Sequence, residues 1–439
     1  MYKTDIYIDF DKINKKIENL ELTISEGRVK KIIGLTVEVE GIKAFVGELC
    51  VIYNQVNKPV NCEVVGFKDK EVILMALGEL TLIAPGCKVI SKGIPLSVMC
   101  SDNLLGKVLD GLGNPIDNSD AVLGDRYNLN NEPPDPMKRK KIRNIMETGV
   151  RAIDAFTTCG EGQRIGIFAG SGVGKSTTLG MIARNAKADV NVIALIGERG
   201  REVLDFIDKD LGEEGMKKSV VVCATSDKAP LVRLKGALTA TAIAEYFRDQ
   251  GKKVILMMDS VTRFAMAQRE VGVAIGEPPA QKGYTPSVFA MLPKLMERTG
   301  TSDKGSITAF YTVLVDGDDF NEPIADTTRG ILDGHIVLSR DLANKNHYPS
   351  IDVLNSLSRL MNEIASKEDI KIASFARDML AEYREAEDLI NIGAYASGTN
   401  KKIDEAIYYH EHIINFLKQG INEKSSFNET ISSLRRVFE

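Results

Sequence analysis

A short glycine-rich stretch constrains the fold of this chain more than any other part of its 439 residues. The apolar run 165–168 predicts a buried strand, and alternating glycines follow it. A segment that predicts a helix opens with Lys175 and Ser176. Glycine permits backbone conformations that turn successive N–H groups toward one point, and a helix start adds partial positive charge there. Strand, loop and helix in this order predict a phosphate-binding loop.

Each part of this loop has an expected role toward a nucleotide. Lys175 offers a positive charge to the β- and γ-phosphates, and the Ser176 hydroxyl is placed to bind Mg²⁺. Ala169 occupies the position where the strict pattern has a glycine, which is the smallest possible departure. We therefore expect ATP and Mg²⁺ as cofactors. The residues expected to bind them are Gly170, Ser171, Gly172, Val173, Gly174, Lys175, Ser176 and Thr177.

Composition narrows the class of protein. Hydrophobic residues make up 44% of the chain and charged residues 27%, as in ordinary globular proteins, and the length suggests about three domains. The net charge of −5 argues against a protein that coats nucleic acid, so no nucleic-acid partner is expected. Six scattered cysteines without a Cys-x-x-Cys pair indicate reduced thiols. A polar N-terminus and the lack of a ~20-residue apolar run predict a cytoplasmic location.

The N-terminal third changes character twice. Residues 1–20 carry an apolar stripe at helical spacing, which is too short to form its own core. It predicts either a helix packed on its own domain or a docking helix for a partner. Residues 21–96 contain several short strand patterns separated by turns, which indicates a small β-barrel or sandwich. Residues 97–150 read as a proline- and lysine-containing linker that leads into the next domain.

The rest of the chain divides into two further parts. In residues 151–345, apolar runs alternate with helical patterns. Such runs are buried on both faces in a mostly parallel sheet covered by helices, so an α/β fold is predicted. Residues 346–439 predict a C-terminal helical domain with almost no strand signal. The apolar runs are 192–196, 220–223, 254–258 and 307–311, and the expected C-terminal helices are 353–364, 370–389 and 404–417.

Two carboxylates directly follow predicted strands. Asp259 ends the run 254–258, and ligands of open α/β sheets bind at the carboxyl ends of strands, so Asp259 is a candidate Mg²⁺ residue. Glu198 follows the run 192–196 and could orient the water that attacks the γ-phosphate. A carboxylate favoured at a helix start is the alternative for Glu198, and more so for Glu202. Phosphoryl transfer also uses an arginine, and spacing cannot choose among the candidates, Arg199, Arg329, Arg340 and Arg359.

Several motifs together resemble a known family. They are the loop 169–176, Gly197-Glu198-Arg199-Gly200-Arg201-Glu202 and Met258-Asp259-Ser260-Val261-Thr262-Arg263. This combination resembles the catalytic subunits of rotary ATPases. Further stretches are similar to the flagellar protein-export ATPase and to its close relative, the ATPase of virulence type III secretion. These stretches are 276–280, 283–284, 286–289, 331–340 and 393–395, and the resemblance covers nearly the whole chain.

The resemblance implies an N-terminal β-barrel, a RecA-like P-loop ATPase domain and a C-terminal helical domain. It implies a homohexameric ring whose Mg²⁺-dependent ATP hydrolysis energises protein export. By position, Lys175 and Ser176 hold phosphates and Mg²⁺, and Asp259 holds Mg²⁺ through water. The other positions matched to the family are Glu198 as the catalytic carboxylate, Arg199 as a neighbouring site residue, Arg359 as an arginine finger toward the next subunit, and Tyr348 as an aromatic stacking on adenine.

The same resemblance implies partners. The loop 277–285 would face a central channel that holds a coiled-coil stalk protein, and residues 1–20 would dock a stator-like regulator. Export substrates, their chaperones and a membrane export gate, reached indirectly, complete the set, so the protein would be peripheral to the membrane apparatus. Three alternatives stay open here: a virulence secretion ATPase, a rotary ATP synthase catalytic subunit, and a hexameric RNA translocase. The acidic net charge and the lack of an aromatic-rich single-strand platform in residues 21–96 argue against the last.

Overall fold

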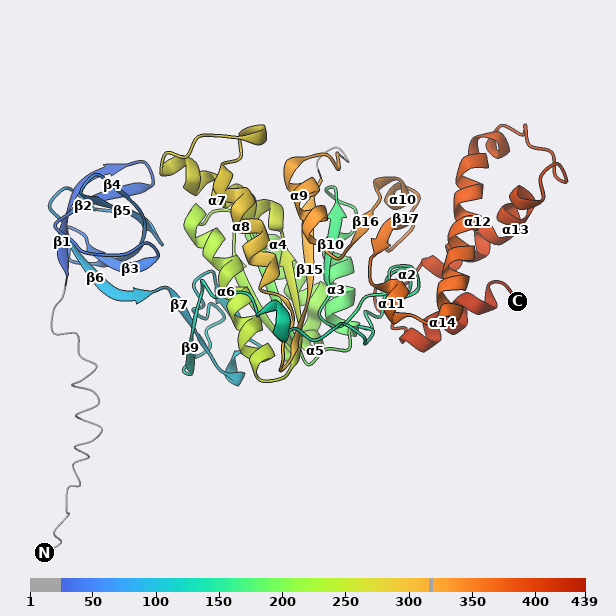
Figure 1. Ribbon diagram of the computed structural model, residues 1–439, viewed down its shortest axis with the longest axis horizontal. Helices are drawn as coiled ribbons and strands as arrows, with labels where there is room; N and C mark the ends of the chain where they lie inside the picture. Colours follow the sequence, from blue (N-terminus) through green and yellow to red (C-terminus); the bar gives the residue numbers. More distant parts are fainter. Residues whose placement is uncertain (1–24, 316–318) are drawn as a thin grey trace, which may run out of the picture. The chain divides into compact units, whose positions relative to one another are not determined.

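The computed structural model describes residues 25–315 and 319–439, and these divide into two compact units, one up to Leu96 and one from Ser97 onward (Figure 1). The predicted docking segment 1–20 lies outside the described residues. Among the helices of the described ranges, none combines the length and the apolar character needed to cross a membrane.

The first unit is a closed six-stranded barrel, which confirms the predicted β-domain. Inward side chains such as Val37, Val64 and Leu74 are fully buried and form its core. Cys50 and Cys62 lie opposite each other on neighbouring strands as free thiols, and burial raises the pKa of Cys50 to about 12. The strands, in their order around the barrel, are β1 (Glu26–Ile33), β2 (Thr36–Glu40), β5 (Glu71–Ala76), β4 (Pro59–Lys68), β3 (Glu48–Tyr53) and β6 (Lys88–Pro95).

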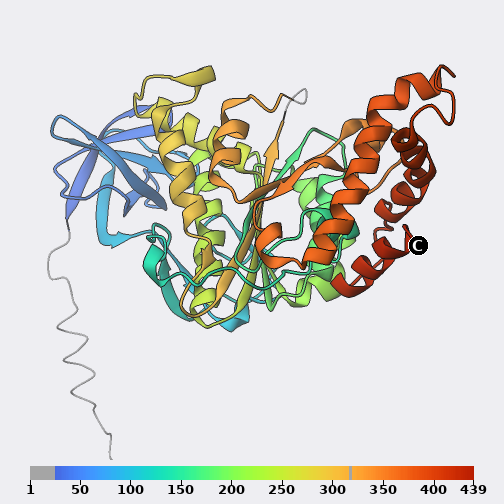
Figure 2. The same ribbon diagram turned by 45° about the vertical axis from the view of Figure 1, so that its right-hand side comes forward.

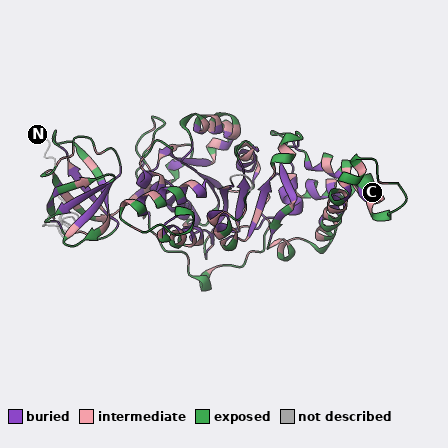
Figure 3. Ribbon diagram, turned by 90° about the horizontal axis from the view of Figure 1, so that it is seen from above, coloured by how far each residue is buried: buried purple, intermediate pink, exposed green. Residues whose placement is uncertain are grey.

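The second unit is built on one large sheet, in agreement with the predicted α/β fold. Its strand order is β17-β16-β10-β15-β13-β11-β12-β8, and the pairings from β16 to β8 are parallel. The strands are β8 (Val108–Asp110), β10 (Arg164–Ala169), β11 (Val190–Ile196), β12 (Ser219–Ala224), β13 (Lys253–Asp259), β15 (Ser306–Leu314), β16 (Gly334–Leu338) and β17 (Ile351–Ser358). A short strand, β14 (Gly300–Thr301), pairs antiparallel with β15. Figure 3 shows that the central strands are buried along most of their length.

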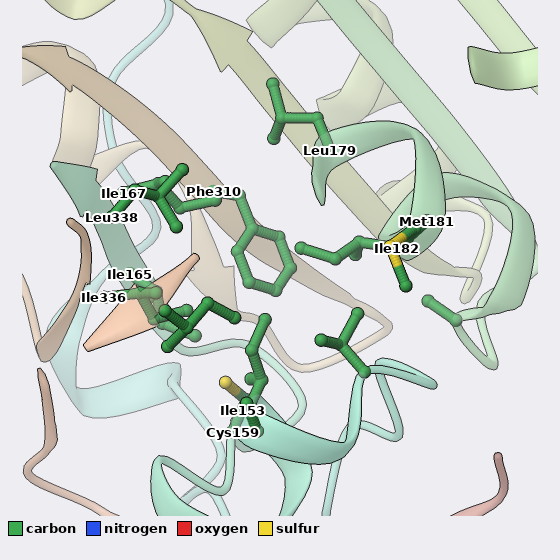
Figure 4. Close-up of a cluster of buried hydrophobic side chains, with 14 of the residues drawn as sticks. Ile153, Cys159, Ile165, Ile167, Leu179, Met181, Ile182, Phe310, Ile336 and Leu338 are labelled. Atoms are coloured by element: carbon green, nitrogen blue, oxygen red, sulfur yellow. The ribbon is translucent and has the colours of Figure 1, made fainter. Parts of the chain in front are cut away.

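Helices cover both faces of this sheet. On one face, α6 (Pro230–Asp249) packs on β11, β12 and β13, and α7 (Val261–Ala274) and α8 (Pro286–Glu297) lie beside it. On the other face, α2 (Arg151–Phe156) and α3 (Lys175–Asn185) close an aliphatic core around Phe310, Ile167 and Ile182 (Figure 4). The remaining elements between β11 and β16 are α4 (Gly200–Asp205), the π-helix η3 (Phe206–Leu211), α5 (Gly212–Lys217), η4 (Gln281–Gly283) and α9 (Pro323–Ile331).

The segment 97–150, predicted as a linker, contains ordered structure. Its strand β8 pairs with β12 and forms one edge of the large sheet. Strands β7 (Ser97–Cys100) and β9 (Asp125–Asn128) form a separate antiparallel pair, and two short 3₁₀ turns, η1 (Asp102–Leu104) and η2 (Pro136–Lys138), complete it.

One predicted helix is wrong. Residues 353–364 were expected to be helical, but Ile351–Ser358 is the strand β17, antiparallel to β16. Only α11 (Met361–Ile364) is helical in that range. The second half of β17 alternates between exposed and buried residues, with Asn355 and Leu357 outside and Ser356 and Ser358 inside, which is the period of a strand. Its small polar residues hide this alternation from a search for apolar periodicity.

Three C-terminal helices follow, and two of them were predicted. They are α12 (Lys367–Asn391), α13 (Lys401–Leu417) and α14 (Phe427–Arg436), preceded by the short α10 (Arg340–Asn344) between β16 and β17. Figure 2 shows α12 and α13 side by side in red. Arg384 of α12 pairs with Asp352 of β17 at 3.0 Å, and Arg377 donates to the carbonyl of Phe156 in α2. These contacts fasten the helices to the edge of the sheet.

Candidate nucleotide-binding site

The loop between β10 and α3 has the backbone of an anion cradle. Gly172 and Gly174 have φ values of +79° and +87°, which side chains rarely adopt. A Cβ built on Gly172 would meet no atom within 4 Å, so there is open space beside the loop at this position. Ser176 is exposed in the first turn of α3, whereas Val173 is buried and its carbonyl accepts a 2.6 Å hydrogen bond from the Ser350 hydroxyl. The loop is anchored at one point and open where phosphates would bind.

Lys175 is held between two acids. Its Nζ lies 2.5 Å from Asp259 Oδ1 and 3.3 Å from Glu198 Oε1. Asp259 ends β13 and Glu198 follows β11, and these neighbouring parallel strands end at the same edge as β10. Although burial opposes its charge, the carboxylates of Asp259 and Glu198 hold the pKa of Lys175 above its usual value. The three residues singled out from separate motifs therefore form one cluster.

Glu198 sits in an environment that disfavours its charge. It is 7% exposed, and burial raises its pKa to about 7, with Lys175 opposing and Asp259 adding to the rise. A hydrogen bond with Glu202 also raises this pKa and lowers that of Glu202. Arg263 lies 3.6 Å from Glu198 Oε1 and donates at 2.6 Å to the carbonyl of Gly197. A carboxyl poised near neutrality can accept a proton from water or return it.

The donor set fits a nucleotide with a divalent cation. A phosphate that binds Lys175 competes with the two carboxylates for the same ammonium group, which leaves their oxygens available to a hydrated Mg²⁺. In the described ranges, no group of three or more His, Cys, Asp and Glu side chains is arranged to hold a metal by itself. Oxygens of the phosphates, water and the Ser176 hydroxyl would therefore complete the coordination, as is usual for Mg²⁺ in nucleotide sites.

Tyr348 lies beside the phosphate loop, at the carboxyl ends of the parallel strands. Its ring lies so close to the loop that a Cβ on Gly174 would be 3.5 Å from it. Tyr348 is 41% exposed, and its backbone carbonyl accepts a 3.0 Å hydrogen bond from the backbone N–H of Gln419. An exposed aromatic face beside the phosphate loop is suited to stacking on a base.

Arg359 is not part of this cluster. Its amide donates to the carbonyl of Asp333, whose own amide donates to the carbonyl of Arg164, the first residue of β10. The phosphate loop follows Ala169 at the other end of that strand. Five residue steps at about 3.3 Å each place Arg359 and the loop about 17 Å apart along the strand direction. The Arg359 side chain is exposed and makes one 3.4 Å contact, to the carbonyl of Arg329.

The other candidate arginines are bound locally or exposed. The Arg199 side chain is 77% exposed and pairs with Glu202 at 3.7 Å, so it does not contact Lys175 or Asp259 in this structure. Arg329 pairs with Asp326 one turn away in α9. Arg340 is exposed at the start of α10.

Sequence reasoning missed three residues that position the site. Thr312 of β15 donates at 2.8 Å to Asp259 Oδ1, Ser350 anchors the loop, and Asp210 of η3 hydrogen bonds with Thr177. They come from segments that are distant in sequence, and an isolated threonine, serine or aspartate carries no local signal. The register of β15 beside β13, once known, brings Thr312 to the level of Asp259.

Comparisons with known proteins identify relatives of this chain over nearly its whole length. Residues 149–358 match the model of the ATP synthase alpha/beta family nucleotide-binding domain, residues 29–93 match that of its beta-barrel domain, and residues 365–436 match the T3SS EscN ATPase C-terminal domain. The chain is 55% identical over 429 residues to the flagellum-specific ATP synthase of Bacillus subtilis, with 96% of this chain and 98% of that protein covered.

Solved structures are similar over almost the same range. The assembled ATPase EscN from the enteropathogenic E. coli type III secretion system superposes with a TM-score of 0.90 and is 46% identical. EscN in complex with its central stalk EscO gives a TM-score of 0.88 at 45% identity. Each comparison covers 94% of this chain and 100% of the EscN chain.

Proposed function

The chain belongs to the ATP synthase alpha/beta family, in the branch of the type III secretion ATPases, and we propose on this premise that it hydrolyses Mg²⁺-ATP as a homohexameric ring that drives flagellar protein export. Membership makes it an ATPase of type III export. The observation that best supports ATP hydrolysis is the position of the Lys175 ammonium group, which lies between Asp259 and Glu198 beside an open phosphate cradle. Ring formation, the metal and the flagellar assignment are the proposed parts.

Each residue of the candidate site is assigned one role in ATP hydrolysis. The loop 170–177 binds the phosphates, Lys175 neutralises charge on the transferring group, and Ser176 with Asp259 holds Mg²⁺, which supplies Lewis-acid stabilisation when bound. Glu198 orients the attacking water, and its pKa near 7 suits a base at neutral pH. Tyr348 stacks on adenine. Arg199 is exposed and lies beside Glu198 in sequence, so we assign it a supporting role at the mouth of the site.

Arg359 is assigned to the neighbouring subunit's nucleotide. It lies at the opposite edge of the sheet from its own phosphate loop, so within one chain it cannot reach a phosphate. A head-to-tail interface in a ring brings opposite faces of successive subunits together, which is the arrangement in which such an arginine can act. The similarity to an assembled EscN supports ring formation.

Partners are proposed on the same basis. The loop that follows α7, residues 277–285, is exposed over most of its length, and the EscN–EscO complex supports a coiled-coil stalk protein as its neighbour in the central channel. Residues 1–20 are proposed to dock a stator-like regulator. Export substrates, chaperones and the membrane export gate are assigned through family membership, with the protein peripheral to the membrane.

Flagellar export is favoured over the alternatives. The chain is 55% identical to the flagellum-specific ATP synthase of Bacillus subtilis and 48% identical to the type 3 secretion system ATPase of Xanthomonas euvesicatoria. The match of residues 365–436 to the EscN C-terminal domain favours either secretion ATPase over a rotary synthase subunit. No feature of residues 25–315 and 319–439 favours a hexameric RNA translocase.

The proposal predicts that ATP hydrolysis depends on both Mg²⁺ and assembly. Specific activity is expected to rise steeply with protein concentration as the oligomer forms, because each site needs an arginine from a second chain. Turnover and mass, from light scattering or mass photometry, are measured over the same dilution series with Mg²⁺ and with EDTA. A flat activity profile for a monomeric protein would contradict the shared site, and a need for a second, homologous chain would favour a rotary synthase subunit.

The pH dependence of hydrolysis tests Glu198. Because its pKa is raised to about 7, protonation below that pH removes the base, and kcat/KM is expected to fall about tenfold per pH unit on the acid side. Glu202→Ala removes a hydrogen bond that raises this pKa, so the fall should move to lower pH. Asp205→Ala, which removes a half-buried acid of the same helix paired with Lys209, is the matched control and should not shift it. An acid limb unmoved by Glu202→Ala would mean that another group titrates there.

A further inference from the structure

A cavity lies outside the nucleotide site, at the C-terminal helices. It has a volume of about 210 Å³ and is lined by residues of α10, β17, α12 and α13, where the sheet edge meets the C-terminal helices. Its apolar wall is formed by Leu342, Ile351, Val353, Leu380, Ile414 and Leu417. None of these residues belongs to the phosphate loop or to the acidic cluster around Lys175.

A buried histidine in this cavity lacks a hydrogen-bond partner. His347 is 3% exposed and lines the cavity, and its Nε2 atom has no partner among the described residues. Burial, with the nearby Lys418 charge, lowers the pKa of His347 to about 4, so the ring is neutral at pH 7. Leaving a buried polar atom unpaired costs free energy, and a ligand with a polar group at this position would recover it.

The charges at the mouth leave one lysine without a partner. Lys345 pairs with Glu387 at 3.2 Å and Arg384 pairs with Asp352 at 3.0 Å. Lys418 also lines the cavity, is exposed, and makes no ion pair within the described part of the chain. The mouth of the cavity therefore carries an uncompensated positive charge.

Two aromatic side chains form part of the wall. Tyr383 and His410 are stacked with ring centres 3.5 Å apart and 10° between planes, and both line the cavity. Apolar cavities of about 150 Å³ accept benzene, so this one has room for an aromatic ring with a short acidic substituent. We propose that the cavity between β17, α12 and α13 binds a small aromatic carboxylate, whose ring contacts the apolar wall and whose polar groups contact His347 and Lys418.

The test is direct binding of a probe to the full-length protein. Indole-3-acetate is titrated by calorimetry at low ionic strength, with indole-3-acetamide as the uncharged analogue. One molecule is expected to bind per chain, with and without saturating Mg²⁺-ADP. Lys418→Gln is expected to weaken the acid at least about tenfold, and the amide should bind the native protein with a similar loss. Lys345→Gln, a lysine at the same mouth that already has a partner, is the matched control and should change little.

Two further comparisons keep the result interpretable. His347→Phe removes the unpaired nitrogen and keeps a ring of similar shape, so it should weaken both probes. Absence of saturable binding, displacement of the probe by ADP, or equal losses in Lys418→Gln and Lys345→Gln would each overturn the proposal. Because the experiment measures binding and not hydrolysis, its result tests this site independently of the proposed ATPase mechanism.

Discussion

Arg359→Ala should lower the turnover of the assembled protein by about 10³- to 10⁵-fold, the range associated with arginine fingers in phosphoryl transfer. Nucleotide affinity of the isolated subunit should be unchanged, because Arg359 lies at the edge of the sheet opposite the phosphate loop. The side chain is exposed, so the free energy of unfolding should change by no more than about 0.5 kcal/mol. Steady-state hydrolysis and ADP titration on one preparation measure both effects.

Controls separate a shared site from a general defect. Arg359→Lys keeps the charge without the forked geometry and should recover only part of the activity. Arg436→Ala removes an exposed arginine of α14 that donates to the Ser433 hydroxyl one turn away, and it should have little effect. The sharpest control mixes Arg359→Ala with Lys175→Ala subunits, since about a quarter of random interfaces then join an intact loop to an intact arginine. Mixtures as inactive as either variant alone would rule out an arginine supplied in trans.

Lys175→Ala should reduce turnover at least about 10³-fold and weaken ATP binding, because a charge aimed at the transferring phosphate is lost. It should also destabilise the nucleotide-free protein. Asp259 and Glu198, 3% and 7% exposed, would be left without their shared cation, and breaking such a buried pair costs about 3–5 kcal/mol. The loss should shrink as pH falls from 8 to 5, because protonation of one carboxyl relieves their repulsion. Urea unfolding of the native protein and of Lys175→Ala at pH 8 and at pH 5 measures this loss of stability.

Two further variants serve as controls for Lys175→Ala. Lys187→Ala removes a lysine that is 78% exposed and should alter neither activity nor stability appreciably. Glu198→Gln keeps the ion pair of Lys175 with Asp259, so it should bind nucleotide normally while kcat falls by about 10²- to 10⁴-fold. If Lys175→Ala hydrolyses ATP within tenfold of the native rate, the assignment of this loop as the phosphate site fails.

The parts of the fold predicted correctly were those specified by local sequence. The strand, glycines and helix start around Lys175 are consecutive, and each apolar run of the central domain is long enough to mark a buried strand. The strand ends then placed Asp259 and Glu198 together, because parallel strands that finish at one edge converge there. Residues such as Thr312 and Ser350 were not predictable, since their contacts depend on strand register and on a chain crossing far away.

The sequence prediction and the structure differ at two further elements, and each difference has a specific cause. The sequence pattern predicts a helix where β17 lies, because the buried positions of β17 include serines, which an apolar search does not count. Pairing with β16 determines the conformation of this segment. Helix α14 was overlooked although a usable signal was present. Ser426 and Glu429 form a reciprocal capping box at its start, a pattern that sequence alone can reveal.

The placement of β17 has a consequence for dividing the molecule. Because this strand is the last of the large sheet and Ser350 just before it holds the phosphate loop, a fragment that stopped at residue 345 would lose both. It would leave β16 as a bare edge with unpaired backbone groups, a template for aggregation. The helices that follow are joined to that strand by Arg384 and to α2 by Arg377. The C-terminal helices therefore brace the edge of the sheet, and a fragment of this domain must extend at least through β17.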